Sequence, residues 1–294
     1  MITEIAPAPE RVEPAPAGPR GRRRAWDEAP RWQIYVPLSI YLVFTLIPFY
    51  WILLFALRPA GSTSLVPWPM TFEHFEKVWN ERAFGTYFQN SVLVGVSTLV
   101  MTTLVALAGG YALARFDFRI KRTFMLALLC TQFVPGALLL VPLFEIFANL
   151  RMINSLSSVV IAETVFQLPL SMILISGFIR NVPYSLEEAA WVDGCNRFTA
   201  FRIVVLPLLR PGLIAVGSFA FVHAWNHFLF ALMFLSDQGK QTIPVGLNTL
   251  MSADSVDLGA LAAGGIIAAV PVVIVFAFIQ KWLITGFSAG AVKG

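Results

Sequence analysis

Long apolar runs dominate this chain of 294 residues, and they constrain its fold more than any other feature. Several runs approach the roughly 20 residues that a helix needs to cross about 30 Å of hydrocarbon. The chain is 57% hydrophobic and 13% charged, whereas a soluble domain carries about 25% charged residues. In lipid every backbone polar group must be bonded within the protein, so these runs indicate helices rather than a barrel. We therefore expect an all-α, polytopic membrane protein.

Six apolar segments have the length of membrane-spanning helices. Prolines occur in several of them, and each proline removes a helix hydrogen bond and favours a kink. Such kinks suit a moving transport core, although many static bundles contain them too. No internal repeat is evident. The expected spans are Gln33–Leu57, Asn90–Ala114, Thr123–Leu150, Leu156–Phe178, Gly212–Leu235 and Gly259–Ile284.

Lysine and arginine residues are distributed unevenly over the segments that connect these spans. One side would hold both termini, the loop before the third span and the segment before the fifth. That side carries 16 of the basic residues, and the opposite side carries five. Because basic loops stay in the cytoplasm, we predict that both termini are cytoplasmic. The same bias accounts for the net charge of +4 without nucleic-acid binding.

Residues 1–31 differ from the remainder in composition, because Pro, Ala, Arg and Glu predominate and bulky apolar side chains are few. Such a segment cannot bury enough surface to fold, so we expect a disordered tail. The run Arg22–Arg24 could belong to a twin-arginine signal, but the apolar run after it is too long and no small-residue cleavage site ends it. We predict two parts, the tail 1–31 and a transmembrane domain 32–294.

A polar segment between the fourth and fifth spans, residues 183–211, has the most specific pattern in the chain. Ser185 and Glu188 have the spacing of a capping box, which predicts a short helix from Ser185 onward. In that helix two alanines are small enough to enter a groove on a partner, and Trp191 could be an aromatic contact. The pattern indicates a surface that docks on another protein.

The second half of this segment predicts a turn and another helix. Gly194 tolerates the left-handed conformation that ends helices, and Asn196 can cap the helix that follows. That helix would place Phe198, Phe201 and Val205 on one apolar face and would end at Leu206-Pro207.

The simpler interpretation is that Glu188 and Gly194 only cap and turn a loop. The complete spacing from Glu188 to Leu206-Pro207 is more specific than a helix cap, so we predict a coupling role for the segment. The predicted coupling residues are Glu188, Ala189, Ala190, Trp191, Asp193, Gly194, Phe201, Leu206 and Pro207.

Further short motifs accompany the coupling segment: Asn90-Ser91, Tyr111–Arg115, Pro142–Phe144, Leu168-Pro169, Ala224–Asn226 and Gly286–Gly294. With these motifs, the chain from about Pro37 to Gly294 resembles a permease subunit of binding-protein-dependent ABC sugar importers, of the maltose and glycerol-phosphate type. Two positions depart from the family's pattern. Cys195 stands where relatives usually carry Ala, and His227 stands where an acidic residue often follows Trp-Asn.

The resemblance implies a six-helix type I ABC importer transmembrane domain with cytoplasmic coupling helices, in a bacterial inner membrane. It implies four partners besides the lipid bilayer and the sugar: a second permease subunit, two nucleotide-binding ATPase subunits and an extracytoplasmic sugar-binding protein. In relatives the coupling helices dock into a cleft of the ATPase subunit. ATP and Mg²⁺ would bind to those subunits, and this chain would bind no cofactor.

The sequence itself contains no G-x-x-x-x-G-K-[ST] phosphate loop and no plausible nucleophile–base–acid set, so we expect no enzymatic activity. Cys130 and Cys195 form neither a disulfide framework nor a metal site. Two histidines one turn apart, without further ligands, are weak evidence for a metal.

Polar side chains inside the predicted spans are candidates for the substrate path, because such groups are costly at membrane depth. Sugars bind to hydrogen-bonding groups beside aromatic faces, and Trp225 and Phe228 lie near three of the candidates. Alternatively, the two acids could be solvated near the surface, and the histidines could be contacts between helices or subunits. The candidates are Glu145, Glu163, Gln167, His223, Asn226 and His227.

Three other functions stay open on the sequence alone. An ABC permease for a non-sugar solute would have the same coupling segment. A proton-coupled secondary transporter could use Glu145, Glu163 and His223, but it would need inverted repeats or a proton relay. A membrane protein without transport activity would leave the kinked spans and intramembrane acids unexplained.

Overall fold

The computed structural model describes residues 30–251 and 256–291, with side chains described as far as Lys281. The predicted disordered tail therefore lies almost wholly outside the described residues. Of the motif Gly286–Gly294 only the backbone as far as residue 291 is described. The described chain is helical apart from turns and short loops, which confirms the all-α prediction. It divides into two units, residues 1–50 and 51–294.

In the first unit the described residues form most of helix α1, Arg31–Leu57. Pro37 and Pro48 lie inside this helix without ending it. Its 27 residues are sufficient to cross a membrane, so the first predicted span is confirmed to within two residues at its start. The last turn of α1 belongs to the second unit, where Ala56 is buried among apolar side chains.

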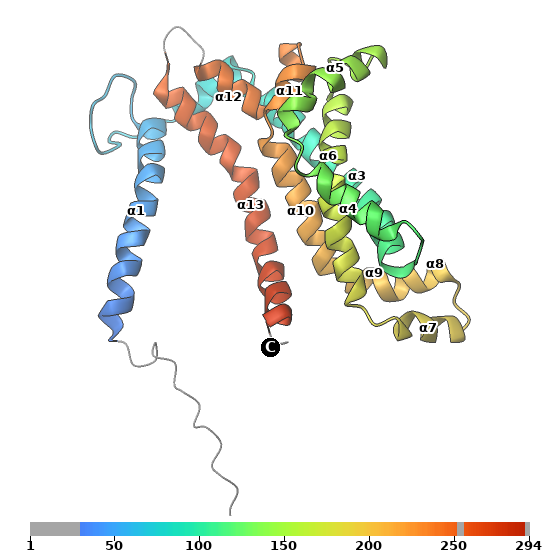
Figure 1. Cartoon of the computed structure of the whole chain (residues 1–294). Coiled ribbons are helices and arrows are strands. Elements are labelled where there is room, and N and C mark those ends of the chain that lie inside the picture. Colours follow the sequence, from blue (N-terminus) through green and yellow to red (C-terminus); the bar gives the residue numbers. More distant parts are fainter. Residues whose placement is uncertain (1–29, 252–255, 292–294) are drawn as a thin grey trace, which may run out of the picture. The chain divides into compact units, whose positions relative to one another are not determined.

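In the second unit three unbroken helices are long and apolar enough to span a membrane (Figure 1). They are α3 (Phe84–Arg115), α6 (Leu156–Arg180) and α13 (Leu258–Ala291). Two bent pairs also qualify. The first joins α4 (Lys121–Thr131) to η2 (Gly136–Leu139) and α5 (Leu140–Asn149) at 94°, and the second joins residues 197–208 to α10 (Arg210–Asn226) at 74°. The described residues thus contain four to six spans.

Two predicted spans are wrong as single helices. The third, Thr123–Leu150, is interrupted between α4 and η2, because Pro135 lacks an amide hydrogen and is extended at ψ 125°. The fifth, Gly212–Leu235, is interrupted at His227, whose ψ of 123° ends α10 before α11 (Leu229–Phe234) begins. Both interruptions are next to the cavity described below.

The second predicted span is also too short at its beginning, because α3 starts at Phe84 rather than Asn90. The polar first turns of α3 are stabilised by tertiary contacts. The Asn90 side-chain amide donates to the carbonyls of Gly239 and Gln241, at 3.0 and 2.9 Å. An apolar run does not reveal such contacts, so the helix extends beyond the apolar residues.

The core of the second unit forms where α3 packs against α6 and α10. Small residues bring these helices close together. A Cβ at Gly110 of α3 would lie 2.7 Å from Ile175 and 3.1 Å from the amide nitrogen of Ser176 on α6. A Cβ at Gly95 would lie 2.8 Å from the Phe221 ring of α10. The three helices therefore form a tightly packed centre on which the shorter elements sit.

The shorter elements gather at the two ends of this centre (Figure 1). One end, which we call the coupling end, carries α7 (Ser185–Val192), α8 (Arg197–Ala200), η3 (Phe201–Val205) and α9 (Leu206–Leu208). The opposite end carries α2 (Glu73–Glu76), η1 (Lys77–Glu81), α11, η4 (Gln238–Lys240) and α12 (Ile243–Met251).

Candidate functional site

The segment 183–211 folds as two short helices joined by a turn, as its sequence predicts. Gly194 has a φ of +87°, in the left-handed region that favours glycine. The Asn196 side-chain oxygen accepts a hydrogen bond from the Thr199 amide at 2.8 Å and so caps α8. Both of these local predictions are confirmed.

Three details of the prediction are wrong. Ser185 does not cap α7, because the helix has Tyr184 as its N-cap and Ser185 is already its first residue. The backbone turn that starts at Pro183 fixes this earlier start, with Leu186 donating to the Pro183 carbonyl. The helical path also continues past Pro207 to Leu208, because proline is tolerated in the first turn of a new helical segment.

The third detail concerns the predicted apolar face of the second helix. Val205 is buried, and the Phe201 ring lies 4.9 Å from the Tyr111 ring. Phe198 is instead 73% exposed. At η3 the chain changes from α-helical to π-helical turns, so residues spaced three or four apart no longer share one face. Sequence spacing alone does not predict this change.

A buried ion pair that the sequence analysis missed fixes the coupling segment to α3. The Glu187 carboxylate accepts hydrogen bonds from Arg115 Nε at 2.6 Å and from the Tyr111 hydroxyl at 2.8 Å. Arg115 also donates to the Val182 carbonyl at 2.9 Å. The side chains of Arg115 and Glu187 are only 8% and 1% exposed. We call Tyr111, Arg115 and Glu187 the Glu187 cluster.

A signal for the Glu187 cluster was present in the sequence. Two adjacent acids on a helix point about 100° apart, so only one of Glu187 and Glu188 can face the membrane domain. The structure buries Glu187 and exposes Glu188. Tyr111 and Arg115 lie one turn apart at the end of α3, which is the spacing of two side chains that reach one partner.

The predicted coupling residues divide into exposed and packed groups. Glu188, Ala189, Asp193 and Gly194 are exposed, and neighbouring Val192 is 88% exposed. The remaining five are at least partly covered. In particular Trp191 is not a free contact, because its ring packs against Tyr184 and under Arg197. The covered residues are Ala190, Trp191, Phe201, Leu206 and Pro207.

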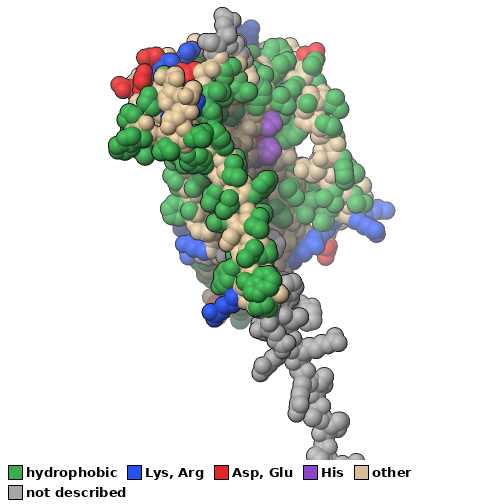
Figure 2. Space-filling model, turned by 90° about the vertical axis from the view of Figure 1, so that its left-hand side faces the viewer, with side chains coloured by type: hydrophobic (Ala, Val, Ile, Leu, Met, Phe, Trp, Pro, Cys, Tyr) green, Lys and Arg blue, Asp and Glu red, His purple; other side chains and the backbone are tan. Residues whose placement is uncertain are grey.

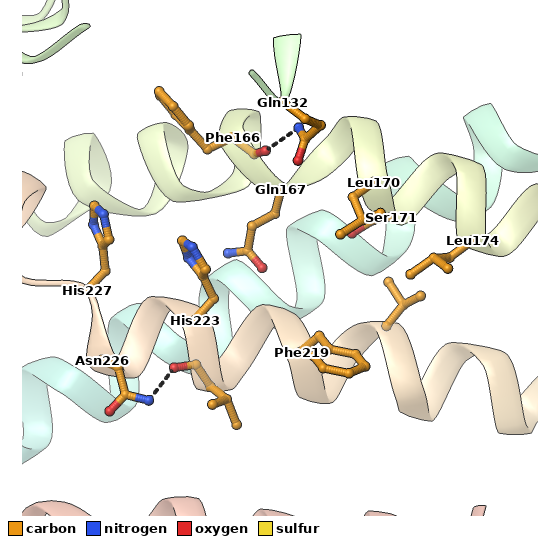
Figure 3. Close-up of a pocket in the computed structure, with 12 residues that line it drawn as sticks. Gln132, Phe166, Gln167, Leu170, Ser171, Leu174, Phe219, His223, Asn226 and His227 are labelled. Carbon is orange, nitrogen blue, oxygen red and sulfur yellow. Dashed lines mark hydrogen bonds between the residues drawn. The ribbon is translucent and has the colours of Figure 1, made fainter. Parts of the chain in front are cut away.

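A cavity of about 770 Å³ lies between α6 and α10, at mid-length of the unit (Figure 3). Four of the six predicted substrate-path residues line it: Gln167, His223, Asn226 and His227. The sequence analysis missed Gln132 and Ser171, which add polar groups, and Phe166 and Phe219, which add aromatic surface. Gln167 points from α6 toward α10, whereas His223 and His227 point from the α10 side toward α6 (Figure 3).

Glu163 lies behind this cavity and pairs with both histidines. Its carboxylate lies 3.1 Å from His223 Nδ1, as a hydrogen bond, and 2.5 Å from His227 Nδ1. The second contact does not have hydrogen-bond geometry. The two imidazole rings stack with centroids 5.3 Å apart. We call Glu163, His223 and His227 the Glu163 cluster.

The Glu163 cluster controls how the histidines face the cavity. Because both rings direct Nδ1 toward the carboxylate, each directs Nε2 away from it. The His223 side chain is 51% exposed, whereas that of Glu163 is 1% exposed. Figure 2 shows histidine side chains in a hollow flanked by apolar side chains. A buried acid thus orients two polar rings that a solute can reach.

The other predicted path residues behave differently. Glu145 is exposed on α5 and does not line the cavity. Glu163 is buried, so the alternative of a solvated Glu163 is wrong. Trp225 is buried and donates to the Ala268 carbonyl of α13 at 3.0 Å, away from the cavity. Among the described residues no group of His, Cys, Asp and Glu has a metal-binding arrangement.

Comparison with known proteins bears on both sites. A family model described as "Binding-protein-dependent transport system inner membrane component" matches residues 106–288. That range contains the whole coupling segment and every residue that lines the cavity. The match therefore covers the parts of the chain that carry both candidate sites.

Curated relatives match nearly the full length. The chain is 36% identical over 264 residues to the diacetylchitobiose uptake system permease protein DasC of Streptomyces coelicolor, covering 88% of this chain and 95% of the relative. It is 31% identical to the sulfoquinovosyl glycerol transport system permease protein SmoH of Agrobacterium fabrum, with 88% and 93% covered. It is 30% identical to the trehalose transport system permease protein SugB of Mycobacterium tuberculosis, with 87% and 95% covered.

A solved structure supports the fold independently. One chain of a bacterial ABC transporter involved in the import of the acidic polysaccharide alginate superposes with a TM-score of 0.70 at 21% identity. The match covers 86% of this chain and 98% of that one. At this identity the similarity establishes the fold alone.

Proposed function

Since this chain belongs to the family of binding-protein-dependent transport system inner membrane components, we propose that it carries a sugar or oligosaccharide inward through a bacterial inner membrane. The relatives named above serve uptake of diacetylchitobiose, sulfoquinovosyl glycerol and trehalose, all sugars or sugar derivatives. The chain itself is a multi-pass membrane protein and a transport subunit. Its energy would come from ATP hydrolysed on partner subunits.

The partners and the orientation of the chain complete the proposal. A second permease subunit would pack beside this chain in the membrane, and two ATPase subunits would sit at the coupling end. An extracytoplasmic binding protein would deliver the sugar to the opposite end. The excess of basic residues at the coupling end supports its placement in the cytoplasm. ATP and Mg²⁺ would then bind outside this chain.

The observation that supports the coupling role most directly is the Glu187 cluster. A surface that transmits force must be rigidly attached to what it moves. Glu187 attaches α7 to α3 through two short hydrogen bonds in a buried setting. Around this attachment Ala189, Val192 and Phe198 stay uncovered, and they give an ATPase subunit a small apolar surface.

The mechanism we propose is alternating access. Closure of the ATPase pair displaces α7 and α8, and the Glu187 cluster passes this displacement to α3. Because α3 packs tightly on α6 and α10, the helices that line the cavity move with it. The bends at Pro135 and Leu209 are where the chain can change direction as the cavity opens to the other side.

The cavity fits a solute rich in hydroxyl groups. The amide oxygens of Gln132, Gln167 and Asn226 can accept from hydroxyl groups, while their nitrogens already donate to backbone carbonyls. The histidines offer ring nitrogens. Phe166 and Phe219 provide the apolar faces on which a pyranose ring can lie. We propose that this subunit contacts the sugar during its passage, with Glu163 orienting the histidines from behind.

A pair of glycine variants tests the coupling role. Gly194 and Gly61 have φ values of +87° and +77°, and neither would meet a neighbouring atom within 4 Å through an added Cβ. Valine therefore strains the backbone similarly at both positions. In the reconstituted importer we expect Gly194→Val to abolish ATP hydrolysis stimulated by the binding protein, and Gly61→Val to retain it.

Equal stimulation in the two variants would contradict the coupling role. The same vesicles also separate the rival mechanism. Uptake that persists without ATP and follows a proton gradient would identify a secondary transporter that uses the Glu163 cluster.

A further inference from the structure

A groove at the coupling end has features that the transport function does not explain. It encloses about 610 Å³ between the loop after α3, the helix α4 and the last residue of α6. Four basic side chains line it, namely Arg119, Lys121, Arg122 and Arg180, together with Asp117 and the apolar residues Phe118, Met125, Leu126 and Leu129. We call this the basic groove.

The charges in the basic groove are not balanced within the chain. Lys121 pairs with Asp117 at 2.9 Å, and this hydrogen bond holds the pKa of Asp117 below its ordinary value. None of the three arginines has an acidic partner within ion-pair distance among the described residues. The Arg180 guanidinium instead lies 3.8 Å from the Met125 sulfur. Asp117 is the one acid in the lining, against four basic side chains, so the groove carries a surplus of positive charge.

The apolar part of the groove runs along α4, from the basic residues at its start into the span. Arg122, Leu126 and Leu129 recur at i, i+4 and i+7 and so share one face of α4. Arg122 is at the start of that helix, and the two leucines lie one and two turns further into the span, about 6 and 10 Å away along the axis. Leu126 and Leu129 are 53% and 43% exposed, and no side chain of α4 is buried.

The position of the groove matches the boundary of a membrane. α3 ends at Arg115, α4 begins at Lys121 and α6 ends at Arg180, so three candidate spans reach one level. The start of α4 also has no side-chain cap, and since the Lys121 amide donates to the Phe118 carbonyl at 3.0 Å, only the amides after it could face an anion. Basic pockets between helices on the cytoplasmic side suit acidic lipid head groups.

We propose that the basic groove binds an anionic phospholipid of the inner leaflet, with the phosphate between Arg122 and Arg180 and an acyl chain along Leu126 and Leu129. A soluble anion would use the cations but would leave the apolar face uncovered. An ATPase subunit would contact a surface that projects beyond the lipid headgroups. The exposed face of α7 and α8 already offers such a surface. The proposal rests on the orientation given above and is independent of the substrate.

The test compares two double variants of the purified importer in phosphatidylcholine nanodiscs doped with phosphatidylglycerol. In Arg122→Gln/Arg180→Gln we expect the preference for bound phosphatidylglycerol, measured by native mass spectrometry, to fall on the order of 10- to 30-fold, from about 1 kcal/mol per basic residue. The control, Arg82→Gln/Arg151→Gln, removes two exposed arginines at the opposite end and should retain the preference. Both variants keep most basic residues on the coupling side, so insertion should be normal.

Two further measurements decide between sources of the phosphate. Glycerol phosphate in large excess should not displace the lipid, and Leu126→Ser/Leu129→Ser should weaken its binding without a change in charge. Equal lipid preference in the two arginine variants, or displacement by glycerol phosphate, would overturn the proposal. Labelling of Cys195 from one side of sealed vesicles checks the orientation separately, so a wrong orientation is distinguishable from an empty groove.

Discussion

Glu187 at the coupling end and Glu163 beside the cavity are both buried carboxylates that each receive two side chains from neighbouring helices. Their partners differ. Glu187 is held by a guanidinium and a phenol, and an arginine stays charged at every accessible pH. Glu163 is held by two imidazoles, which can be charged or neutral and which keep one ring nitrogen each for another partner.

The contrast teaches how one bundle separates attachment from recognition. A buried pair with permanent charges and all hydrogen bonds satisfied fixes one element on another. A buried acid with histidines at a cavity wall positions groups that stay available to a solute. The Glu187 cluster therefore suits force transmission, and the Glu163 cluster suits contact with a passing sugar.

The largest expected effect tests the attachment at the coupling end. Arg115→Met leaves the Glu187 carboxylate buried without its cation, which should destabilise the protein by about 3–5 kcal/mol. Thermal unfolding of the purified importer should show this loss. Adding Glu187→Met removes the orphaned charge, so the double variant should recover much of the stability without recovering stimulated ATP hydrolysis. Glu188→Gln is the matched control, because Glu188 is exposed and its loss should change stability little.

A smaller effect is expected at the cavity. Glu163→Gln keeps one oxygen that can accept from an imidazole, so we expect a loss of about 1–3 kcal/mol, less than for Arg115→Met. Uptake should fall more than stability suggests, because the histidines lose their common orientation. Stability measurements beside uptake in the same vesicles check this. A loss larger than that of Arg115→Met would contradict the division between the two clusters.

Substitutions of the two histidines should have different effects. His227 is the less exposed, at 24% of its side chain, and its ring packs 4.5 Å from Phe230. His223 is half exposed to the cavity. We expect His227→Ala to lower the unfolding temperature more, and His223→Ala to raise the KM for uptake more. Equal changes in unfolding temperature and in KM for the two variants would show that the two histidines have the same role at the cavity.

The smallest effect concerns an ion pair at the end opposite α7, where Lys77 Nζ lies 2.8 Å from Asp257. Burial alone would raise the pKa of Asp257, but the bonds from Lys77 and the Ala260 amide outweigh it and hold that pKa below its ordinary value. The hydrogen bond to Asp257 raises the pKa of Lys77. The stability that Asp257 contributes through its lowered pKa is lost as the pH falls through that folded pKa. The stability that Lys77 contributes through its raised pKa is lost as the pH rises through that folded pKa. Between about pH 4 and 10 both contribute.

Because both members of this pair are about one-third exposed, solvent screening keeps the contribution small. Lys77→Met should cost less than about 1 kcal/mol at pH 7. The difference from the wild type should shrink as the pH falls below about 4 and vanish once the pH is below the lowered folded pKa of Asp257. Unfolding temperatures measured across that range check the sign, and a difference that grows in acid would contradict it.

The sequence by itself determined the all-α class, the spans that are unbroken, the turn at Gly194, the cap at Asn196 and the polar residues of α10, because local periodicity and short-range geometry fix these features. Only the tertiary structure decided that Glu187 rather than Glu188 attaches the coupling helices, that Glu163 is paired rather than solvated, and that Trp225 faces away from the cavity. Each of these depends on which helix packs beside which residue. Packing between segments distant in the chain has no counterpart in a single run of sequence.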